Sequence, residues 1–461
     1  METAPLTIRQ AQERLRAGTL TAVELVEQCL AVADEFDSQL HAWVSIDATG
    51  ARQAAAASDE LRRRGAARGP LDGIPVGIKD IVDVAGWPTL AASPLRAGHR
   101  AKVDAPLVAQ LRSGGAVILG KTVTTEWACF DPPPTRNPWN LQRTPGGSSS
   151  GSAAAVAAGM CLAAIGSQTG GSITRPAAYC GVVGFKPTLG RVCTAGLVPV
   201  SFHLDHPGPI ASSVDDAALV LAAIADPDFA DARLTSKFGD SESDVWQATA
   251  ATPPRFGLLQ GYFWQQAAED VRQVCASATS QLAAQGADVT DVALPEEFDG
   301  VHRHHRTIMA VEAAAYHRSR YPKHRDQFGP QVASLLEEGV QTDARDYADA
   351  LAHRMRFRAA FDRLLADFDA ILMPATPNAA PGPETTGDPS FNSPWSYAGV
   401  PIVTLPCGLT DERMPVGLQL VAQSRAEAAL LAAAIWCERQ FAFNARPPLA
   451  ALTDSASRVE L

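Results

Sequence analysis

The sequence lacks the features that would place it in a membrane or on nucleic acid. No window is apolar over the length of a membrane span, because the apolar runs are rich in Ala and Gly and are interrupted by Ser, Thr and Pro. The first residues contain no basic stretch followed by an apolar core, so we expect no secretory signal. Lys and Arg are scattered and the formal net charge is −11, which argues against binding to nucleic acid or to an anionic membrane surface.

Metal-binding and disulfide patterns are also missing. The eight cysteines include no C-x-x-C pair and form no regular framework, so we expect free thiols in a reducing compartment and predict a cytoplasmic location. Three histidines lie close together at His302, His304 and His305, but no carboxylate or cysteine stands at a matching spacing. A solvated helix surface is therefore favoured over a metal site, and the sequence predicts neither a metal nor a cofactor.

The sequence contains enough hydrophobic residues for a large core, and its patterns predict alternating strands and helices. Hydrophobic residues make up 46% of the 461 residues. Strands are expected at 74–83, 116–119, 182–186, 197–200, 255–259, 287–292, 370–374, 402–405 and 416–422, with a turn at 120–122. Helices are expected at 7–34, 51–64, 105–113, 212–225, 268–285, 304–321, 331–367 and 425–440. The alternation predicts a three-layer α/β/α sandwich with a large mixed, mostly parallel central sheet, and the polar segment 226–252 is expected to be a surface excursion.

A single lysine, Lys79, interrupts the apolar run at 74–83. If this strand is buried on both faces, burial disfavours the charged form of Lys79 and lowers its pKa from about 10.4 towards about 7–8, which would make it a usable base. The alternative is a lysine at the edge of a strand, paired with Asp80 or Asp83. The residues alone leave both interpretations open.

Two glycine-serine turns lie in the segment 145–177, at 146–148 and 170–172, and a run of small residues separates them. The backbone N–H groups of Thr169, Gly170, Gly171 and Ser172 could converge on one anion, as in an oxyanion hole. A phosphate-binding loop is disfavoured because the Lys-Ser/Thr ending is missing. A purely structural turn at 170–172 and a flexible linker at 146–151 remain alternatives when each turn is considered alone.

The combination of motifs resembles the amidase signature family. Its pattern is a Gly-x-Lys strand at 77–79, a Gly-Gly-Ser-Ser-x-Gly turn at 146–151 and a Gly-Gly-Ser followed shortly by Pro-Ala at 170–177. The resemblance covers essentially the whole chain. It implies that Ser172 is the nucleophile, that Ser148 is a bridging serine after a cis peptide bond at 147–148, and that Lys79 is the base.

The family resemblance implies a metal-independent hydrolase that cleaves carbon–nitrogen bonds of small amides through an acyl-enzyme. Primary amides are the first choice of substrate, with anilides, carbamates and urea-type bonds open. The alternative is an amidotransferase subunit that generates ammonia from glutamine for a partner enzyme. We expect residues 1–461 to form a single domain with its catalytic core at about 65–215, and a homodimer is one open oligomeric state. A non-catalytic binding module is disfavoured because all three catalytic residues are present.

Three positions separate this chain from most of the family. Gln168 and Thr174 stand where most members have Asp and Arg, and the resulting Gln-Thr-Gly-Gly-Ser-x-x-Arg-Pro-Ala motif resembles a malonamidase-like branch. Arg175 lies three residues after Ser172, so on a helix it would share a face with the nucleophile. It could bind a carboxylate or carbonyl of the substrate. The alternative is an internal salt bridge with Asp131 or Asp205.

The substrate pocket is expected to be lined by aromatic and small side chains. From the loop before the first glycine-serine turn we predict Trp127, Cys129 and Phe130 as substrate-binding residues. From the late loop we expect Phe391, Trp395 and Tyr397. Such a lining suits a small aryl or acyl group, although aromatic residues are more often part of a plain core.

Overall fold

The computed structural model describes residues 6–226 and 252–450. Its strands are β1 (Trp43–Ile46), β2 (Pro75–Lys79), β3 (Val117–Thr122), β4 (Ala163–Gln168), β5 (Val183–Lys186), β6 (His206–Ala211), β7 (Arg255–Leu259), β8 (Asp288–Val292), β9 (Ala370–Pro374), β10 (Ile402–Leu409) and β11 (Pro415–Val421). The segment 226–252, expected to be a surface excursion, lies almost entirely outside the described residues.

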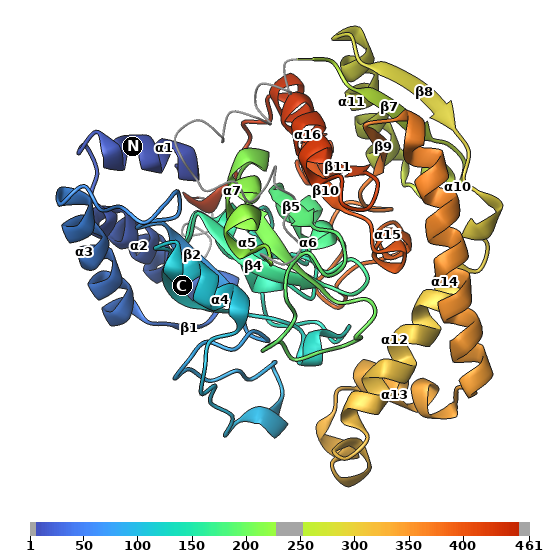
Figure 1. Ribbon diagram of the computed structural model, residues 1–461, viewed down its shortest axis with the longest axis horizontal. Helices are drawn as coiled ribbons and strands as arrows, with labels where there is room; N and C mark the ends of the chain where they lie inside the picture. Colours follow the sequence, from blue (N-terminus) through green and yellow to red (C-terminus); the bar gives the residue numbers. More distant parts are fainter. Residues whose placement is uncertain (1–5, 227–251, 451–461) are drawn as a thin grey trace, which may run out of the picture.

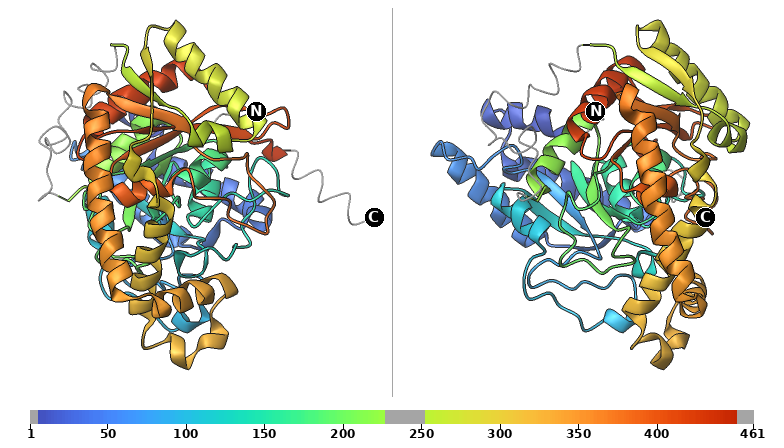
Figure 2. Two further views of the ribbon diagram at one scale, coloured as in Figure 1. Left: turned by 90° about the vertical axis from the view of Figure 1, so that its right-hand side faces the viewer. Right: turned by 45° about the vertical axis from the view of Figure 1, so that its right-hand side comes forward.

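Helices pack around these strands to give a layered α/β molecule (Figures 1 and 2). They are α1 (Ile8–Arg16), α2 (Ala22–Leu40), α3 (Ala48–Arg63), α4 (Pro106–Ser113), α5 (Ser150–Ala157), α6 (Thr174–Cys180), α7 (Val214–Ile224), α10 (Tyr262–Gln266), α11 (Glu269–Ala284), α12 (Val301–His317), α13 (Pro330–Gln341), α14 (Ala344–Leu364), α15 (Ser393–Ala398) and α16 (Glu427–Phe441). Within the described ranges, no helix combines the length and the apolar character that crossing a membrane requires.

All the named strands form one 11-stranded sheet in the order β1-β3-β2-β4-β6-β5-β10-β11-β9-β7-β8. The sheet is mixed, as expected, but it is not mostly parallel. The parallel pairs are β2–β3, β2–β4, β7–β8 and β7–β9, whereas the other six pairs are antiparallel. The alternation of strands and helices therefore predicts the two parallel groups correctly and misses the antiparallel centre between them.

Strand β6 forms two of the six antiparallel pairs. It lies between β4 and β5, antiparallel to both, although its sequence His-Pro-Gly-Pro-Ile-Ala does not look like a central strand. Proline cannot donate a hydrogen bond to a neighbouring strand and glycine weakens strands, so local sequence argues against this assignment. In the fold, Pro207 pairs with Ser167 and Pro209 pairs with Ile165 on β4.

Other differences concern element ends. The turn expected at 120–122 belongs to β3, and the strand expected at 197–200 is reduced to one isolated bridge between Val82 and Leu197. The helix expected at 331–367 is two helices, α13 and α14, because Asp343 caps the second by accepting a hydrogen bond from the backbone N–H of Arg345. At the start of α2, Thr21 and Glu24 form a capping box in which each side chain accepts a hydrogen bond from the other residue's backbone N–H.

Candidate active site

Lys79 is the last residue of β2 and is fully buried. Its Nζ lies 2.7 Å from Ser148 Oγ and 2.8 Å from Ser167 Oγ. Within the described residues it forms no ion pair with a carboxylate. Burial lowers the pKa of Lys79 from 10.5 to about 7, although the charge of Asp205 opposes the shift. Near neutral pH a substantial fraction of Lys79 is therefore an uncharged amine.

The predicted alternative, a lysine at a strand edge paired with Asp80 or Asp83, is wrong. Strand β2 lies between β3 and β4, and Asp80 instead pairs with Lys121 of β3 at 2.8 Å, where both side chains are 1% exposed. Asp80 thus neutralises the second buried lysine of this region. Lys79 has no comparable carboxylate in contact with it among the described residues, which is why burial shifts its pKa so far.

Ser148 stands at the turn before α5, and the Gly147–Ser148 peptide bond is cis, as the family resemblance implies. The following serines bind this turn to neighbouring backbone: Ser149 Oγ donates to Ser167 O at 3.3 Å, and Ser152 Oγ donates to Ile165 O at 3.1 Å. Ser150 Oγ donates to Gly146 O at 2.6 Å. All residues from 146 to 152 are buried, so this segment is not a flexible linker.

The turn 169–172 connects β4 to α6, and each of its carbonyl groups is held by a donor. The acceptor–donor pairs are Thr169 O with His305 Nε2 (3.0 Å), Gly170 O with Ser396 Oγ (2.6 Å), Gly171 O with Arg175 N (2.9 Å) and Ser172 O with Ser149 N (3.3 Å). In the described part of the chain, none of the four N–H groups of the turn donates to a protein acceptor. The turn therefore presents unused donors, as an oxyanion hole requires.

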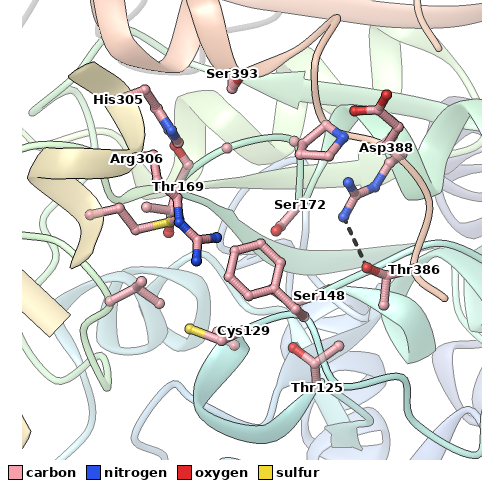
Figure 3. A pocket seen from close by; sticks show the side chains of 18 of the residues that line it. Thr125, Cys129, Ser148, Thr169, Ser172, His305, Arg306, Thr386, Asp388 and Ser393 are labelled. Carbon is pink, nitrogen blue, oxygen red and sulfur yellow. Dashed lines mark hydrogen bonds between the residues drawn. The ribbon is translucent and has the colours of Figure 1, made fainter. Parts of the chain in front are cut away.

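These groups lie at one cavity of about 260 Å³ (Figure 3). Ser148, Ser172 and the turn 169–172 line one part of it. An apolar wall is formed by Ala128, Cys129, Phe130, Val200 and Met309. A polar wall is formed by Thr125, Arg175, His302, Arg306, Thr386, Asp388, Ser390 and Ser393. The three predicted catalytic residues are thus brought together, with Lys79 buried behind Ser148.

The predicted aromatic lining needs correction. Phe130 and Cys129 line the cavity, and burial raises the pKa of the Cys129 thiol to about 12, so it stays protonated. Trp127 does not line the cavity, because its ring packs in the core against His317 (ring centroids 4.5 Å apart) and Phe328 (5.9 Å).

The late aromatic residues are core as well. Phe391, Trp395 and Tyr397 are all fully buried. Trp395 packs against Phe361 with ring centroids 4.6 Å apart, and the Tyr397 hydroxyl donates to a backbone carbonyl of α14. Their segment reaches the cavity through its polar residues instead, because α15 and the loop before it carry Asp388, Ser390 and Ser393 there.

Arg175 lines the cavity, and both of its terminal nitrogens are used within the protein, whereas its buried Nε has no partner among the described residues. Nη2 donates to Gly147 O at 2.7 Å and to Thr386 Oγ1 at 3.3 Å, and Nη1 donates to Gly387 O at 2.8 Å. The internal salt bridges considered for it do not form. Asp131 accepts hydrogen bonds from the first N–H groups of α13, and Asp205 accepts from Thr169 Oγ1 at 2.6 Å. Arg175 therefore ties the Ser148 turn to the loop at 386–387.

Gln168 and Thr174 form a neutral contact where the family resemblance implies an Asp–Arg pair. Gln168 Oε1 accepts hydrogen bonds from the N–H groups of Ile173 and Thr174 at 2.8 and 2.9 Å, and from Thr174 Oγ1 at 3.1 Å. Its Nε2 donates to Ser396 Oγ at 3.0 Å. The Gln168 side-chain amide thus caps the first turn of α6 and also binds Ser396, whose hydroxyl donates to Gly170 O. Membership of a malonamidase-like branch stays a prediction.

The three histidines have different partners and do not form a cluster. His305 is 5% exposed and holds Thr169 O, His302 lines the cavity with Nδ1 3.3 Å from Ser393 Oγ, and His304 stacks on His353. In the described ranges no group of three His, Cys, Asp or Glu residues could hold a metal ion. Burial lowers the pKa of His305 to about 4, so at neutral pH it is uncharged and donates through Nε2.

We predict that His305→Phe lowers kcat for amide hydrolysis by about 10- to 100-fold with little change in KM. The aromatic ring is kept in this variant, while the N–H donor that orients Thr169 O is lost. Steady-state kinetics of the variant checks this. His304→Phe is the matched control, since His304 lies on the same helix but outside the cavity lining. Equal activity of the two folded variants would exclude an orienting role for His305.

Comparison with known proteins finds matches over most of the chain. The family model described as Amidase matches residues 24–431 of the chain. A curated relative, a glutamyl-tRNA(Gln) amidotransferase subunit of Chloroflexus aggregans (strain MD-66 / DSM 9485), is 35% identical over 478 residues, covering 92% of this chain and 94% of the relative.

Two solved structures extend the comparison. The native peptide amidase from Stenotrophomonas maltophilia is 32% identical with a TM-score of 0.82, over 97% of this chain and 99% of that one. A protein from an unexpected vestigial protein complex, described as revealing the evolutionary origins of an s-triazine catabolic enzyme, is 31% identical with a TM-score of 0.86, over 96% of this chain and 100% of that one.

Proposed function

Because this chain belongs to the amidase family, an enzyme group that acts on carbon–nitrogen bonds other than peptide bonds, we propose that it hydrolyses small-molecule amides with Ser172 as nucleophile. Ser148 and Lys79 are the proton relay, and the N–H groups of residues 169–172 form the oxyanion hole. The observation that carries the proposal is the turn 169–172, whose carbonyls are all held by donors while its N–H groups lie unused at the cavity.

The proposed reaction is acyl transfer in two stages. Neutral Lys79 accepts a proton from Ser148 as Ser148 accepts one from Ser172, and Ser172 Oγ attacks the amide carbonyl carbon. The N–H groups stabilise the oxyanion. The proton then returns from Lys79 through Ser148 to the leaving nitrogen, the carbon–nitrogen bond breaks, and ammonia or an amine departs. Water attacks the acyl-enzyme by the same relay and releases the carboxylic acid.

The pH dependence of the reaction should follow the ionisation of the Lys79 amine. Since only the uncharged amine is a base and its pKa is about 7, we expect kcat/KM for a neutral amide to rise with pH, to reach half of its maximum near pH 7 and to level off about one pH unit higher. Asp205→Asn should move the rising limb to lower pH, because the Asp205 charge raises the pKa of Lys79. Rate profiles between pH 5 and 9 test both statements, and a profile that falls through neutrality would contradict them.

An amidotransferase subunit is the second candidate, and the curated relative supports it. The neutral Gln168–Thr174 contact at 3.1 Å favours the hydrolase, since the glutaminase members resemble the Asp/Arg version of the motif. Ammonia release by the purified chain decides between the two. Release from simple amides without any other protein supports the hydrolase, whereas glutamine-specific release that needs a partner supports the amidotransferase.

Substrate choice requires a direct screen. Primary amides, half-amides of dicarboxylic acids, anilides and carbamates should be offered to the purified protein, with ammonia or amine release as the readout. Ser172→Ala is the blank for each compound. A signal that persists in this variant would show that the reaction does not use Ser172.

A further inference from the structure

Two guanidinium groups line the cavity, and their environments differ. Arg175 gives its terminal nitrogens to Gly147 O, Gly387 O and Thr386 Oγ1, and its side chain is 4% exposed. It therefore belongs to the wall and holds the backbone beside Ser148. A substrate group could displace these contacts only by leaving two backbone carbonyls without a donor, which costs free energy in a buried site.

Arg306 has terminal nitrogens that the protein does not use. It lies on α12 one residue after His305, and its Nε donates to Glu338 Oε2 at 2.8 Å. In residues 6–226 and 252–450 no acceptor contacts its Nη1 or Nη2. Figure 3 shows the guanidinium group of Arg306 extending from the helix over the cavity that Ser148 and Ser172 line.

Two contacts orient the guanidinium group of Arg306, whose side chain is 38% exposed. Its central carbon lies 5.3 Å from the centroid of the Phe130 ring, a cation–π distance, and Glu338 fixes its Nε edge. Glu338 does not line the cavity, so it orients the guanidinium group from outside. The opposite edge, with both Nη atoms, is left for a ligand. A guanidinium group oriented in this way can bind a carboxylate with two parallel hydrogen bonds through its free Nη atoms.

The apolar wall lies beside this charge. Phe130 and Met309 line the cavity together with the turn 169–172, and Met309 is three residues after Arg306 on the same helix. A short carbon chain could lie against these side chains between the reacting carbonyl and the guanidinium group. Among the described residues that line the cavity, the only carboxylate is that of Asp388, which is exposed and comes from the loop before α15.

We propose that Arg306 is the substrate-anchoring residue of this enzyme and that its substrates are small amides carrying a carboxylate group, which Arg306 binds while Ser172 attacks the amide. This inference rests on the proposed function of Ser172. The carboxylate could belong to the acyl part, as in the half-amide of a dicarboxylic acid, or to the amine part, as in an N-acyl amino acid. In both cases the same guanidinium group would recognise it.

Matched pairs of charged and neutral amides test the proposal. Succinamate is compared with 4-oxopentanamide, and N-acetylglycine with N-acetylaminoacetone, because a methyl group replaces one carboxylate oxygen in each neutral analogue. We expect the unmodified enzyme to prefer the charged member of at least one pair. Arg306→Gln should then lower kcat/KM for that member by about 10- to 100-fold, mainly through KM, and change the neutral analogue by less than about threefold.

Control variants separate this proposal from a structural effect. Arg303→Gln removes an exposed arginine from the same helix, outside the cavity. It should leave kcat/KM unchanged for both members of the pair. Arg306→Lys keeps the charge but loses the two-point geometry, so it should recover only part of the preference. The proposal is overturned if Arg306→Gln affects both members of a pair equally, or if the unmodified enzyme prefers both neutral analogues. If the unmodified protein hydrolyses none of these amides, the proposed function itself is refuted.

Discussion

Ser172→Ala is expected to lower kcat for amide hydrolysis by about four to six orders of magnitude, to the level left by binding and the oxyanion hole alone. The variant retains the N–H groups of residues 169–172 but has no atom that can form the acyl-enzyme. Within the described chain the Ser172 hydroxyl donates to no other group, so thermal unfolding should be unchanged. Ammonia release under saturating substrate measures the first effect, and calorimetry measures the second.

Covalent labelling gives an independent readout of the same variant. A fluorophosphonate should modify the unmodified protein once and should not modify Ser172→Ala. Ser390→Ala is the matched control, because Ser390 also lines the cavity but lies outside the turn. If Ser172→Ala is still labelled, or if Ser390→Ala loses activity to the same extent, the nucleophile has been wrongly assigned.

Lys79→Met is expected to lower kcat by about 10⁴-fold or more while making the protein at least as stable as the unmodified chain. Keeping a lysine of pKa about 7 buried, against the ordinary lysine value of 10.5, costs on the order of 4 kcal/mol at pH 7. Methionine has no such cost and nearly the same length. Against this gain stand two lost hydrogen bonds, to Ser148 and Ser167, each contributing about 1 kcal/mol.

The pH dependence of this stability difference has a definite sign. The folded pKa of Lys79 lies below the unfolded value, so the protonated form favours unfolding. The free-energy cost of burying Lys79 is absent above about pH 10.5, grows as the pH falls, and reaches its full value below about pH 7. The stability of Lys79→Met relative to the unmodified protein should therefore be highest at or below neutral pH and should decrease towards pH 10.

Lys121→Met is the matched control for this prediction. Lys121 is equally buried, but it pairs with Asp80 at 2.8 Å, so its loss leaves a buried carboxylate without a partner. We expect that variant to be destabilised by about 3–5 kcal/mol. Thermal unfolding of both variants across pH 6–10 makes the comparison. Equal destabilisation of Lys79→Met and Lys121→Met would mean that Lys79 is not a neutral amine in the folded protein.

The family and the three residues proposed for catalysis could be predicted from local sequence. Each motif limits its own backbone: an apolar strand carries Lys79 inward, and consecutive glycines allow the turn before Ser172 to expose its N–H groups. These are short-range effects that a sequence pattern records. The large mixed sheet followed from the same kind of pattern. Strand β6 in its antiparallel centre did not, because it contains prolines that local sequence patterns exclude from a central strand.

The contacts that orient the site were decided by the tertiary structure. His305 and Ser396 hold the carbonyls of Thr169 and Gly170 although they come from helices more than 130 residues further along the chain. No spacing rule connects residues so far apart. The tertiary structure also distinguishes Arg175 from Arg306, because which donors remain for a ligand depends on which acceptors the fold brings near. Local chemistry thus determined what this protein can do to an amide, and long-range packing decided which groups meet the rest of the substrate.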